Sequence, residues 1–152
     1  MAGKGILNYT TSIDAGKTRG EVIGLLVSAG ATNISLDFEN KTCTGVSFYA
    51  HTPVGERGFR LPLRADAVLA ALNRAYQSSR IPRRFANSEQ AERVAWRINH
   101  EWLEVQLALI EAGLAELGEI MMPYMIVGEQ GQTAFQLMSE KKALPPGMRG
   151  AA

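Results

Sequence analysis

Apolar side chains recur every three or four residues from Asn87 to Met122, a segment that contains no proline before Pro123. This spacing is the period of an α-helix, so the sequence predicts one long helix near residues 88–122, capped by Asn87 or Ser88. Two apolar stripes run along neighbouring faces of this helix. The first stripe comprises Ala91, Val94, Ala95, Ile98, Trp102, Val105, Leu109 and Ala112. The second stripe comprises Leu103, Leu107, Ile110, Leu114, Leu117 and Met121.

A straight helix over this segment would be roughly 50 Å long, whereas a compact domain of this chain length is only about 30 Å across. The helix is therefore predicted to project or to bend, with Gly113 and Gly118 as the candidate bend or close-contact positions. Each of the two apolar stripes needs a surface that buries it. The first is predicted to cover the sheet and the second to form an oligomer interface, because a long exposed apolar stripe promotes aggregation. The alternative is that helix 65–78 and the C-terminal segment cover both faces within one chain.

Elsewhere, apolar and polar positions alternate, which is the period of a half-buried strand. Ile6–Ile13 is rich in β-branched and aromatic residues and is predicted as the first strand. A helix is predicted over 14–31, with Thr18 and Glu21 as a capping pair and Gly30 at its C-terminal end. Three more strands and a second helix are predicted around Ile34–Phe38, Val46–Ala50, Phe59–Leu63 and Ala65–Gln77.

The predicted element order is β-α-β-β-β-α-α. Because strands and helices mostly segregate, the expected fold class is α+β, an antiparallel sheet of about four strands packed on helices. A single domain is predicted for 1–140 and a flexible tail for 141–152, with a late hairpin between 124–127 and 133–137. The inner order α-β-β-β-α is similar to that of the double-stranded-RNA-binding domain. The closing helix lacks the lysines of that family, so the similarity concerns element order alone.

Composition narrows the function classes. The 152 residues carry a net charge of +1, so no global field attracts the chain to nucleic acid or to anionic membranes. No apolar run is long enough to cross a bilayer, and the N-terminus lacks the apolar core of a signal peptide. Cys43 is the single cysteine and cannot form an internal disulfide. We expect a cytoplasmic protein with no cofactor and no membrane partner.

An arginine cluster is the first candidate binding site. Guanidinium groups beside aromatic rings suit phosphates and stacked bases. The alternative is a solvated connector whose charges keep the protein soluble. The candidate binding residues are Arg80, Arg83 and Arg84, which lie between Tyr76 and Phe85, together with Arg93 and Arg97 on the helix.

The long helix carries a second candidate group of ionisable side chains. His100 with carboxylates could hold a metal or transfer a proton. However, no second histidine lies at metal-ligand spacing, so surface ion pairs at i,i+4, such as Arg97 with Glu101, are favoured. No metal ligand and no catalytic residue is therefore assigned. The group comprises Arg93, Arg97, His100, Glu101, Glu104 and Glu111.

Two further motifs are interpreted as structural. Gly16-Lys17-Thr18 follows a predicted strand and precedes a helix, which is the context of a phosphate-binding loop. That loop requires a glycine five residues before Gly16, where this chain has Thr11, so a glycine-containing turn is favoured. A catalytic pair of Cys43 with His51 across a hairpin is conceivable, but a small apolar residue in a sheet is the favoured interpretation.

Three stretches carry a family resemblance over most of residues 5–127. They are GILNYTTSIDAGKT with EVIGLLVSAGA, then GFRLP, then AERVAWRINHEWLEVQLALIEAGLAELGEIMMPYM. Together they resemble small uncharacterised proteins encoded by bacteriophages and prophages, a group without an assigned activity. The resemblance implies a virus-encoded accessory protein that works in the cytoplasm of the bacterial host, and it assigns no catalytic residue.

The predicted function is therefore binding. The first hypothesis is a non-enzymatic homo-oligomer that engages a host protein or a small defence-related ligand, assembled through the second stripe. The second is a nucleic-acid-binding protein of phage replication or recombination that uses the arginine cluster. The third is a metal-dependent enzyme acting on nucleotides, with His100, Glu101 and Glu104 near the metal.

Overall fold

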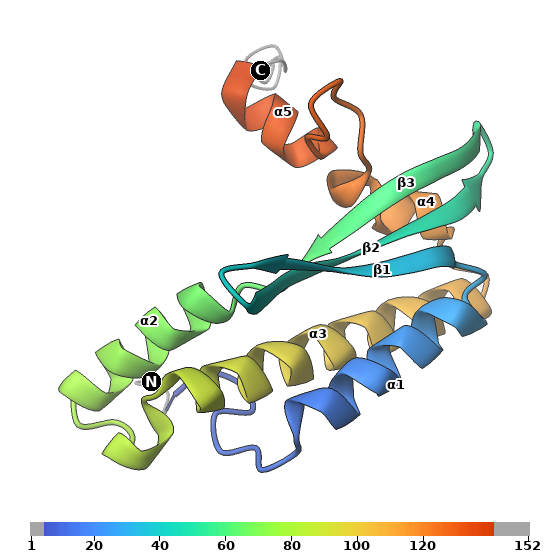
Figure 1. Ribbon diagram of the computed structural model, residues 1–152. Coiled ribbons are helices and arrows are strands. Elements are labelled where there is room, and N and C mark those ends of the chain that lie inside the picture. The colour runs from blue at the N-terminus through green and yellow to red at the C-terminus, as the bar shows by residue number, and fades with distance from the viewer. Residues whose placement is uncertain (1–4, 142–152) are drawn as a thin grey trace, which may run out of the picture.

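The protein is represented by a computed structural model, and the structure describes residues 5–141. A three-stranded antiparallel sheet of order β1-β2-β3 forms one layer and three helices form the other (Figure 1). The α+β class is confirmed, with three strands in place of about four. The strands are β1 (Thr32–Glu39), β2 (Thr42–Thr52) and β3 (Gly55–Pro62). The helices of the layer are α1 (Ala15–Ser28), α2 (Ala65–Gln77) and α3 (Ser88–Glu111).

The strands form where side chains alternate, as predicted. In β2 the side chains of Val46, Phe48 and Ala50 are buried against the helices, while the intervening residues are more exposed. Phe48 stacks on Phe59 of β3 with ring centroids 5.4 Å apart, which ties the two strands on the buried face. Between β1 and β2, Asn40 and Lys41 both have positive φ, as a two-residue hairpin turn matched to the sheet twist requires.

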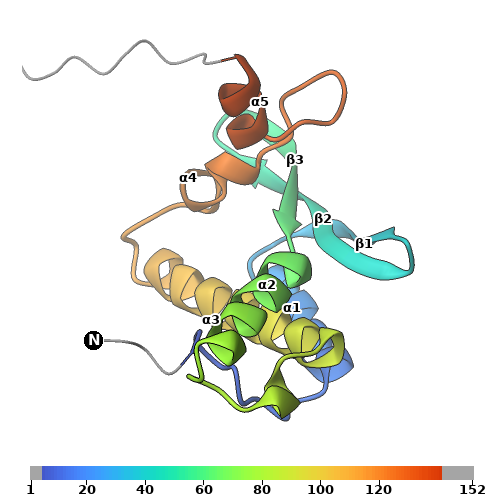
Figure 2. The same cartoon turned by 90° about the vertical axis from the view of Figure 1, so that its left-hand side faces the viewer.

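Helix α3 is the central element of the helical layer, since it contacts α1 along one side and α2 along another (Figure 2). Its Trp96 and Leu103 are fully buried with Val22 and Leu26 of α1 against the sheet. The order α1-β1-β2-β3-α2 matches the predicted similarity to the double-stranded-RNA-binding domain. The helical layer differs from a two-helix layer, because α3 packs against both of the other helices.

The predicted first strand, Ile6–Ile13, is wrong. Within the described chain this segment forms turns and extended backbone outside the sheet, with Asn8 in the left-handed region at φ 64°. The Nε2 group of the buried Gln90 donates hydrogen bonds to the carbonyl oxygens of Tyr9 (2.8 Å) and Thr11 (2.9 Å). These contacts occupy carbonyl groups that a sheet would otherwise pair, so tertiary packing on α3 overrides the β propensity.

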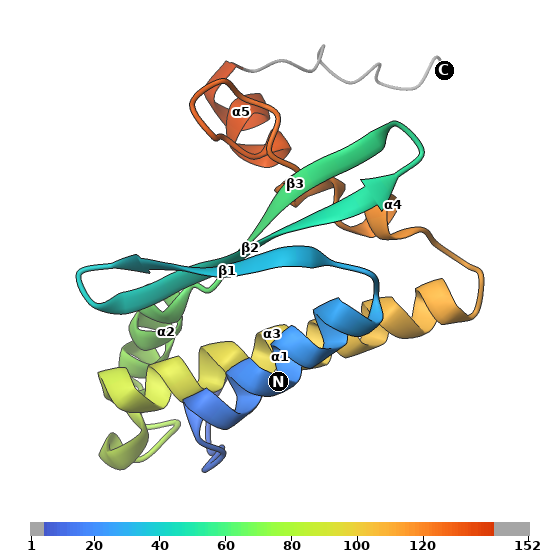
Figure 3. The same cartoon turned by 45° about the vertical axis from the view of Figure 1, so that its right-hand side comes forward.

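The predicted continuous helix over 88–122 is also wrong, because α3 ends at Glu111 (Figure 3). Gly113 adopts φ 75°, and Leu114 N donates to Leu109 O at 2.9 Å, the wrap-around bond of a Schellman motif. Asn87 caps the start, as predicted, by accepting from Gln90 N. The chain then turns back through α4 (Leu117–Ile120) and the 3₁₀ turn η2 (Met122–Tyr124) to lie along the β2–β3 hairpin.

This break divides the predicted oligomer interface. Leu103 and Met121 are each 0% exposed in the chain's own core, so they are unavailable to a partner in this conformation. Leu107 and Leu117 pack against the same core, and Ile110 is half-buried. Only Leu114 is well exposed, at 72%. Most residues of the second stripe are therefore covered within one chain, which was the alternative prediction.

Two smaller expectations are corrected. Asp14, not the pair Thr18 and Glu21, caps α1 by accepting from Gly16 N at 2.9 Å, while Gly30 ends the helix at φ 92° as predicted. The late hairpin reduces to a single bridge between Ile126 and Thr133, after which α5 (Ala134–Lys141) begins. Nearly all of the predicted tail, 141–152, falls outside the described residues.

The helix break is testable with two glycine substitutions of opposite expected sign. Neither Gly113 nor Gly24, inside α1, has an atom within 4 Å of an added Cβ, but only Gly113 has positive φ. We expect Gly24→Ala to raise the free energy of unfolding by about 0.5–1 kcal/mol and Gly113→Ala to lower it by about 1–2 kcal/mol. Urea denaturation measures both. Stabilisation by Gly113→Ala would instead support an uninterrupted helix over 88–122.

Candidate functional site

The exposed arginines lie on the connector between α2 and α3, which is anchored rather than free. Ile81 is buried with Leu72, Ala75 and Ala91, and the 3₁₀ turn η1 (Arg83–Phe85) follows Pro82. With Ile81 turned inward, its neighbours turn to solvent. We call the three exposed arginines on this connector, Arg80, Arg83 and Arg84, the arginine corner.

Local contacts order the arginine corner without neutralising it. Arg80 Nε donates to Ser78 Oγ at 2.8 Å, and the guanidinium of Arg84 lies 4.8 Å from the centre of the Phe85 ring. Across residues 5–141, no carboxylate is paired with any of these three guanidinium groups. The corner therefore presents three charged, multi-donor groups to solvent, a chemistry suited to phosphate oxygens.

The other two predicted binding residues differ from the corner. Arg93 donates through Nε and Nη2 to Gln90 Oε1, at 3.0 and 2.8 Å, and so supports the amide that holds the N-terminal segment. Arg97 Nη1 lies 2.9 Å from Glu21 Oε2 of α1 and is neutralised there. Arg97 therefore belongs to the contact between α1 and α3, and its predicted partner Glu101 is replaced by Glu21.

Two members of the predicted ionisable group on α3, Arg97 and His100, contact Glu21 of α1. We call these three residues, together with Glu104, the clamp. His100 Nε2 lies 3.3 Å from the same oxygen, Glu21 Oε2, and His100 Nδ1 lies 3.7 Å from Glu104 Oε2, four residues further along α3. The hydrogen bond from Arg97 is the main cause that lowers the pKa of Glu21, and burial opposes it. The arrangement holds α1 in register on α3.

Metal and nucleophile chemistry gain no support from the geometry. In the part of the chain described, no group of three or more His, Cys, Asp or Glu side chains is arranged to hold a metal ion. Cys43 is buried, its Sγ donates weakly to Gly45 O, and burial raises the pKa of its thiol. His51 lies eight positions further along the same strand, roughly 26 Å away, so the two cannot form a catalytic pair.

A cleft that the sequence reasoning missed lies between the end of β3, the N-terminal end of α2 and the middle of α3. Its volume is about 300 Å³. The rings of Trp102 on α3 and Tyr124 on η2 meet edge to face at one wall, with centroids 6.0 Å apart and planes at 89°. The first apolar stripe was the sequence feature that could have indicated this cleft. It runs from Ala91 to Ala112, and a helix over 65–77 is too short to cover all of it. The cleft is lined by Leu61, Pro62, Arg64, Val68, Ala95, Ile98, Asn99, Trp102 and Tyr124.

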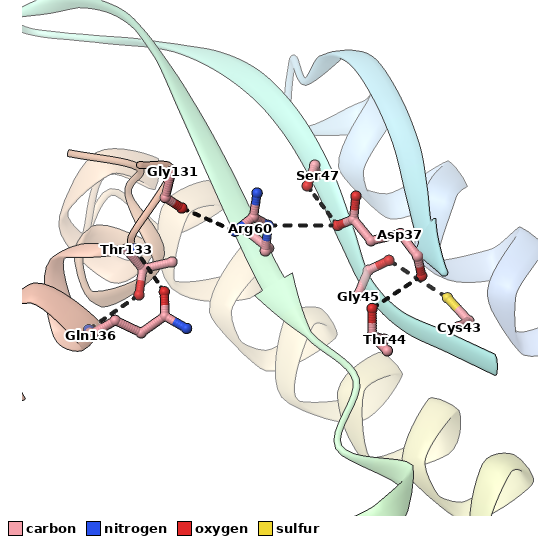
Figure 4. A network of polar contacts seen from close by, with 9 residues as sticks. All are labelled: Asp37, Cys43, Thr44, Gly45, Ser47, Arg60, Gly131, Thr133 and Gln136. Carbon is pink, nitrogen blue, oxygen red and sulfur yellow. Dashed lines mark hydrogen bonds and ion pairs between the residues drawn. The ribbon is translucent and has the colours of Figure 1, made fainter. Parts of the chain in front are cut away.

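The outer face of the sheet carries a polar network that positions the C-terminal segment (Figure 4). Ser47 Oγ donates to Asp37 Oδ2 at 2.7 Å, and Arg60 Nε lies 3.7 Å from the same carboxylate oxygen. Arg60 Nη1 reaches Gly131 O at 3.0 Å. One network centred on Asp37 and Arg60 thus joins the three strands to the C-terminal loop, and Ile126 N also donates to Gly58 O of β3 at 2.8 Å.

Comparison with protein-family models, with curated proteins and with solved structures finds no match to this chain. Over the described residues, no helix combines the length and apolarity needed to cross a membrane.

The contacts of Glu21 in the clamp should make the free energy of unfolding depend on pH. Because the folded pKa of Glu21 is lowered from its ordinary value of 4.5, the ionised carboxylate stabilises the fold above that pH, and the contribution is lost as pH falls through the folded value. We expect Glu21→Gln to lower the free energy of unfolding at pH 7, with the difference from wild type shrinking toward pH 3. The groups that face the Glu21 carboxylate are Arg97 and His100 of α3 and Lys17 of α1.

The matched control is Glu101→Gln, on the same helix face as the clamp but with no ion pair among the residues described. Denaturant unfolding at both pH values should show no loss for this variant. An equal loss for both variants at pH 7 would contradict a specific contact between Glu21 and Arg97.

Proposed function

We propose that this protein is a non-enzymatic binding protein and that its ligand is a nucleic acid, bound at the arginine corner. The observation that supports this best is three exposed, unneutralised guanidinium groups on an anchored connector. Anchoring by Ile81 lowers the entropy lost on binding, because the backbone is ordered before the ligand arrives. The resemblance to bacteriophage proteins makes the bacterial cytoplasm the compartment in which we propose that it acts.

The geometry favours phosphate contacts over base stacking at this site. Phe85 is only half-exposed, because Tyr9 meets its ring at 5.5 Å on one side and Arg84 lies over it. Tyr76, which is 41% exposed near the same connector, is the aromatic side chain with a freer ring. Contacts to the backbone carry no sequence information, so the proposed binding is sequence-independent and salt-sensitive.

Replacement of two corner arginines tests this function. We expect Arg83→Ala with Arg84→Ala to weaken binding to a fluorescein-labelled single-stranded 20-mer by about tenfold or more, because two phosphate contacts are lost. The slope of log affinity against log salt should fall by about 1.4, at roughly 0.7 for each single-strand phosphate contact. Fluorescence anisotropy at several salt concentrations measures both quantities.

The charge-matched control is Lys41→Ala with Arg57→Ala, two exposed cations, one in the β1–β2 turn and one on β3, both remote from the corner in sequence. This variant should keep the affinity and the salt slope of the wild type. Equal weakening in both double variants would show that only net charge matters, and unchanged affinity in the corner variant would exclude the corner as the site.

A second candidate function, homo-oligomerisation to engage a host protein, is favoured by a different observation. Past the N-terminal end of α2, Val105 of the first stripe is 60% exposed on α3. We propose that a second copy covers this face, in place of the interface predicted on the second stripe, because Leu103 and Met121 are occupied in the core.

The oligomer is tested by introducing one charge on this face. We expect the wild type to sediment as a dimer at micromolar concentration and Val105→Lys to sediment as a monomer. The urea midpoints of the two should agree at dilutions where the wild type is also monomeric, because Val105 is exposed in the single chain. Val27→Lys on α1, at a site that is 58% exposed, is the matched control and should remain dimeric. A wild type that stays monomeric at 100 µM would exclude this candidate.

A further inference from the structure

We propose that the cleft between β3, α2 and α3 binds a small aromatic carboxylate that also carries a hydrogen-bond donor on its ring. This ligand is distinct from the nucleic acid proposed for the arginine corner. Most of the lining is apolar, and two polar side chains, Arg64 and Asn99, lie on it. That composition, a largely apolar cleft with few polar groups, is typical of small-molecule sites.

The aromatic wall selects a flat ligand. Because the planes of Trp102 and Tyr124 are perpendicular and their centroids are 6.0 Å apart, a ring stacked on one of them meets the edge of the other. Such paired face and edge contacts are the preferred geometry between aromatic groups. Val68 and Ile98 supply the apolar contact on the α2 and α3 sides. A volume of about 300 Å³ fits a single ring with a short side chain and excludes a nucleotide strand.

Arg64 determines the charge of the ligand. It occupies the N-cap position of α2 but makes no capping hydrogen bond through its side chain. Its guanidinium has no carboxylate partner anywhere in 5–141, so its charge is available at the cleft. A carboxylate is the complementary group, since arginine binds it through two parallel hydrogen bonds.

Asn99 determines the polarity of the ring substituent. Its Nδ2 donates to Ala95 O at 2.8 Å, one turn back on α3. Its Oδ1 accepts no hydrogen bond from the rest of the described chain, so it offers an acceptor to the cleft. A ligand hydroxyl or ring N–H satisfies that acceptor, whereas a second carboxylate would be repelled by it.

The test uses 3-(4-hydroxyphenyl)propanoate as the probe, followed by isothermal titration calorimetry and by tryptophan fluorescence excited at 295 nm. Trp102 is the expected reporter, because Trp96 is 1% exposed in the core. We expect a dissociation constant below about 1 mM. The neutral amide of the probe, and 3-phenylpropanoate without its hydroxyl, should each bind more weakly, since they remove the contacts to Arg64 and Asn99 respectively.

Arg64→Gln, at an exposed site, should weaken binding of the acid by about tenfold and leave binding of the amide unchanged. Arg57→Gln, an exposed arginine on β3 outside the cleft, is the matched control and should bind the acid as the wild type does. No binding at 5 mM, equal affinity for acid and amide, or equal weakening by both variants would each overturn the proposal.

The proposal fails or succeeds independently of the two functions above. Arg83 and Arg84 do not line the cleft, so their alanine variant should bind the probe normally even where nucleic-acid binding is lost. Val105 does not line it either, and Val105→Lys should keep the probe affinity whatever the oligomeric state. Loss of probe binding in either variant would overturn the assignment to this cleft.

Discussion

Burial of α3 between α1, α2 and the sheet is the packing interaction on which the rest of the structure depends. Trp96 and Leu103 lose nearly all of their exposed surface in this contact, and burial of each side chain contributes about 2–3 kcal/mol of hydrophobic stabilisation. Even the N-terminal segment is held by α3, through the amide of Gln90. A single helix thus organises elements that are more than eighty residues apart.

Polar contacts at the margins of this core then determine register. Hydrophobic packing alone tolerates sliding of one helix along another, whereas a hydrogen-bonded charge pair such as Arg97 with Glu21 does not. Arg60 has the same role on the outer face of the sheet, where it joins Asp37 to the carbonyl of Gly131. These contacts are partly exposed, so their energies are modest, and their value lies in the specific arrangement that they select.

Local signals allowed most of the fold to be predicted from the sequence. The alternation in β1, β2 and β3 and the apolar face of α2 each depend on neighbouring residues, and these elements form where predicted. The failures are non-local. Ile6–Ile13 has the composition of a strand, but a glutamine eighty residues later holds it in turns. Gly113, one of the two predicted bend positions, ends α3, but the return of the chain to the sheet beyond it was not predicted.

The same distinction applies to the candidate site. Arg80, Arg83 and Arg84 are neighbours in sequence and remain neighbours on the connector, whereas Arg97 is removed from the group by Glu21, seventy-six positions earlier. Trp102 and Tyr124, which form the aromatic wall of the cleft, lie on opposite sides of the helix break in the sequence. Their contact could therefore be predicted only after the break had been predicted. The sequence also placed the whole second stripe on one continuous helix, whereas Leu117 and Met121 lie beyond the break and pack into the core.

The short length of α2 explains why part of the α3 surface has no helix packed against it. Helix α2 has 13 residues and α3 has 24, which correspond to lengths of about 20 and 36 Å. On the α2 side, roughly the last ten residues of α3 therefore extend past their partner, and η2 returns only far enough to place Tyr124 on Trp102. An apolar helix face without a partner is unfavourable in water, and the fold leaves it open between a charged arginine and an aromatic pair. A longer α2 would cover this face, so the unmatched length of α3 is the feature on which the proposed cleft ligand and the proposed contact between copies both depend.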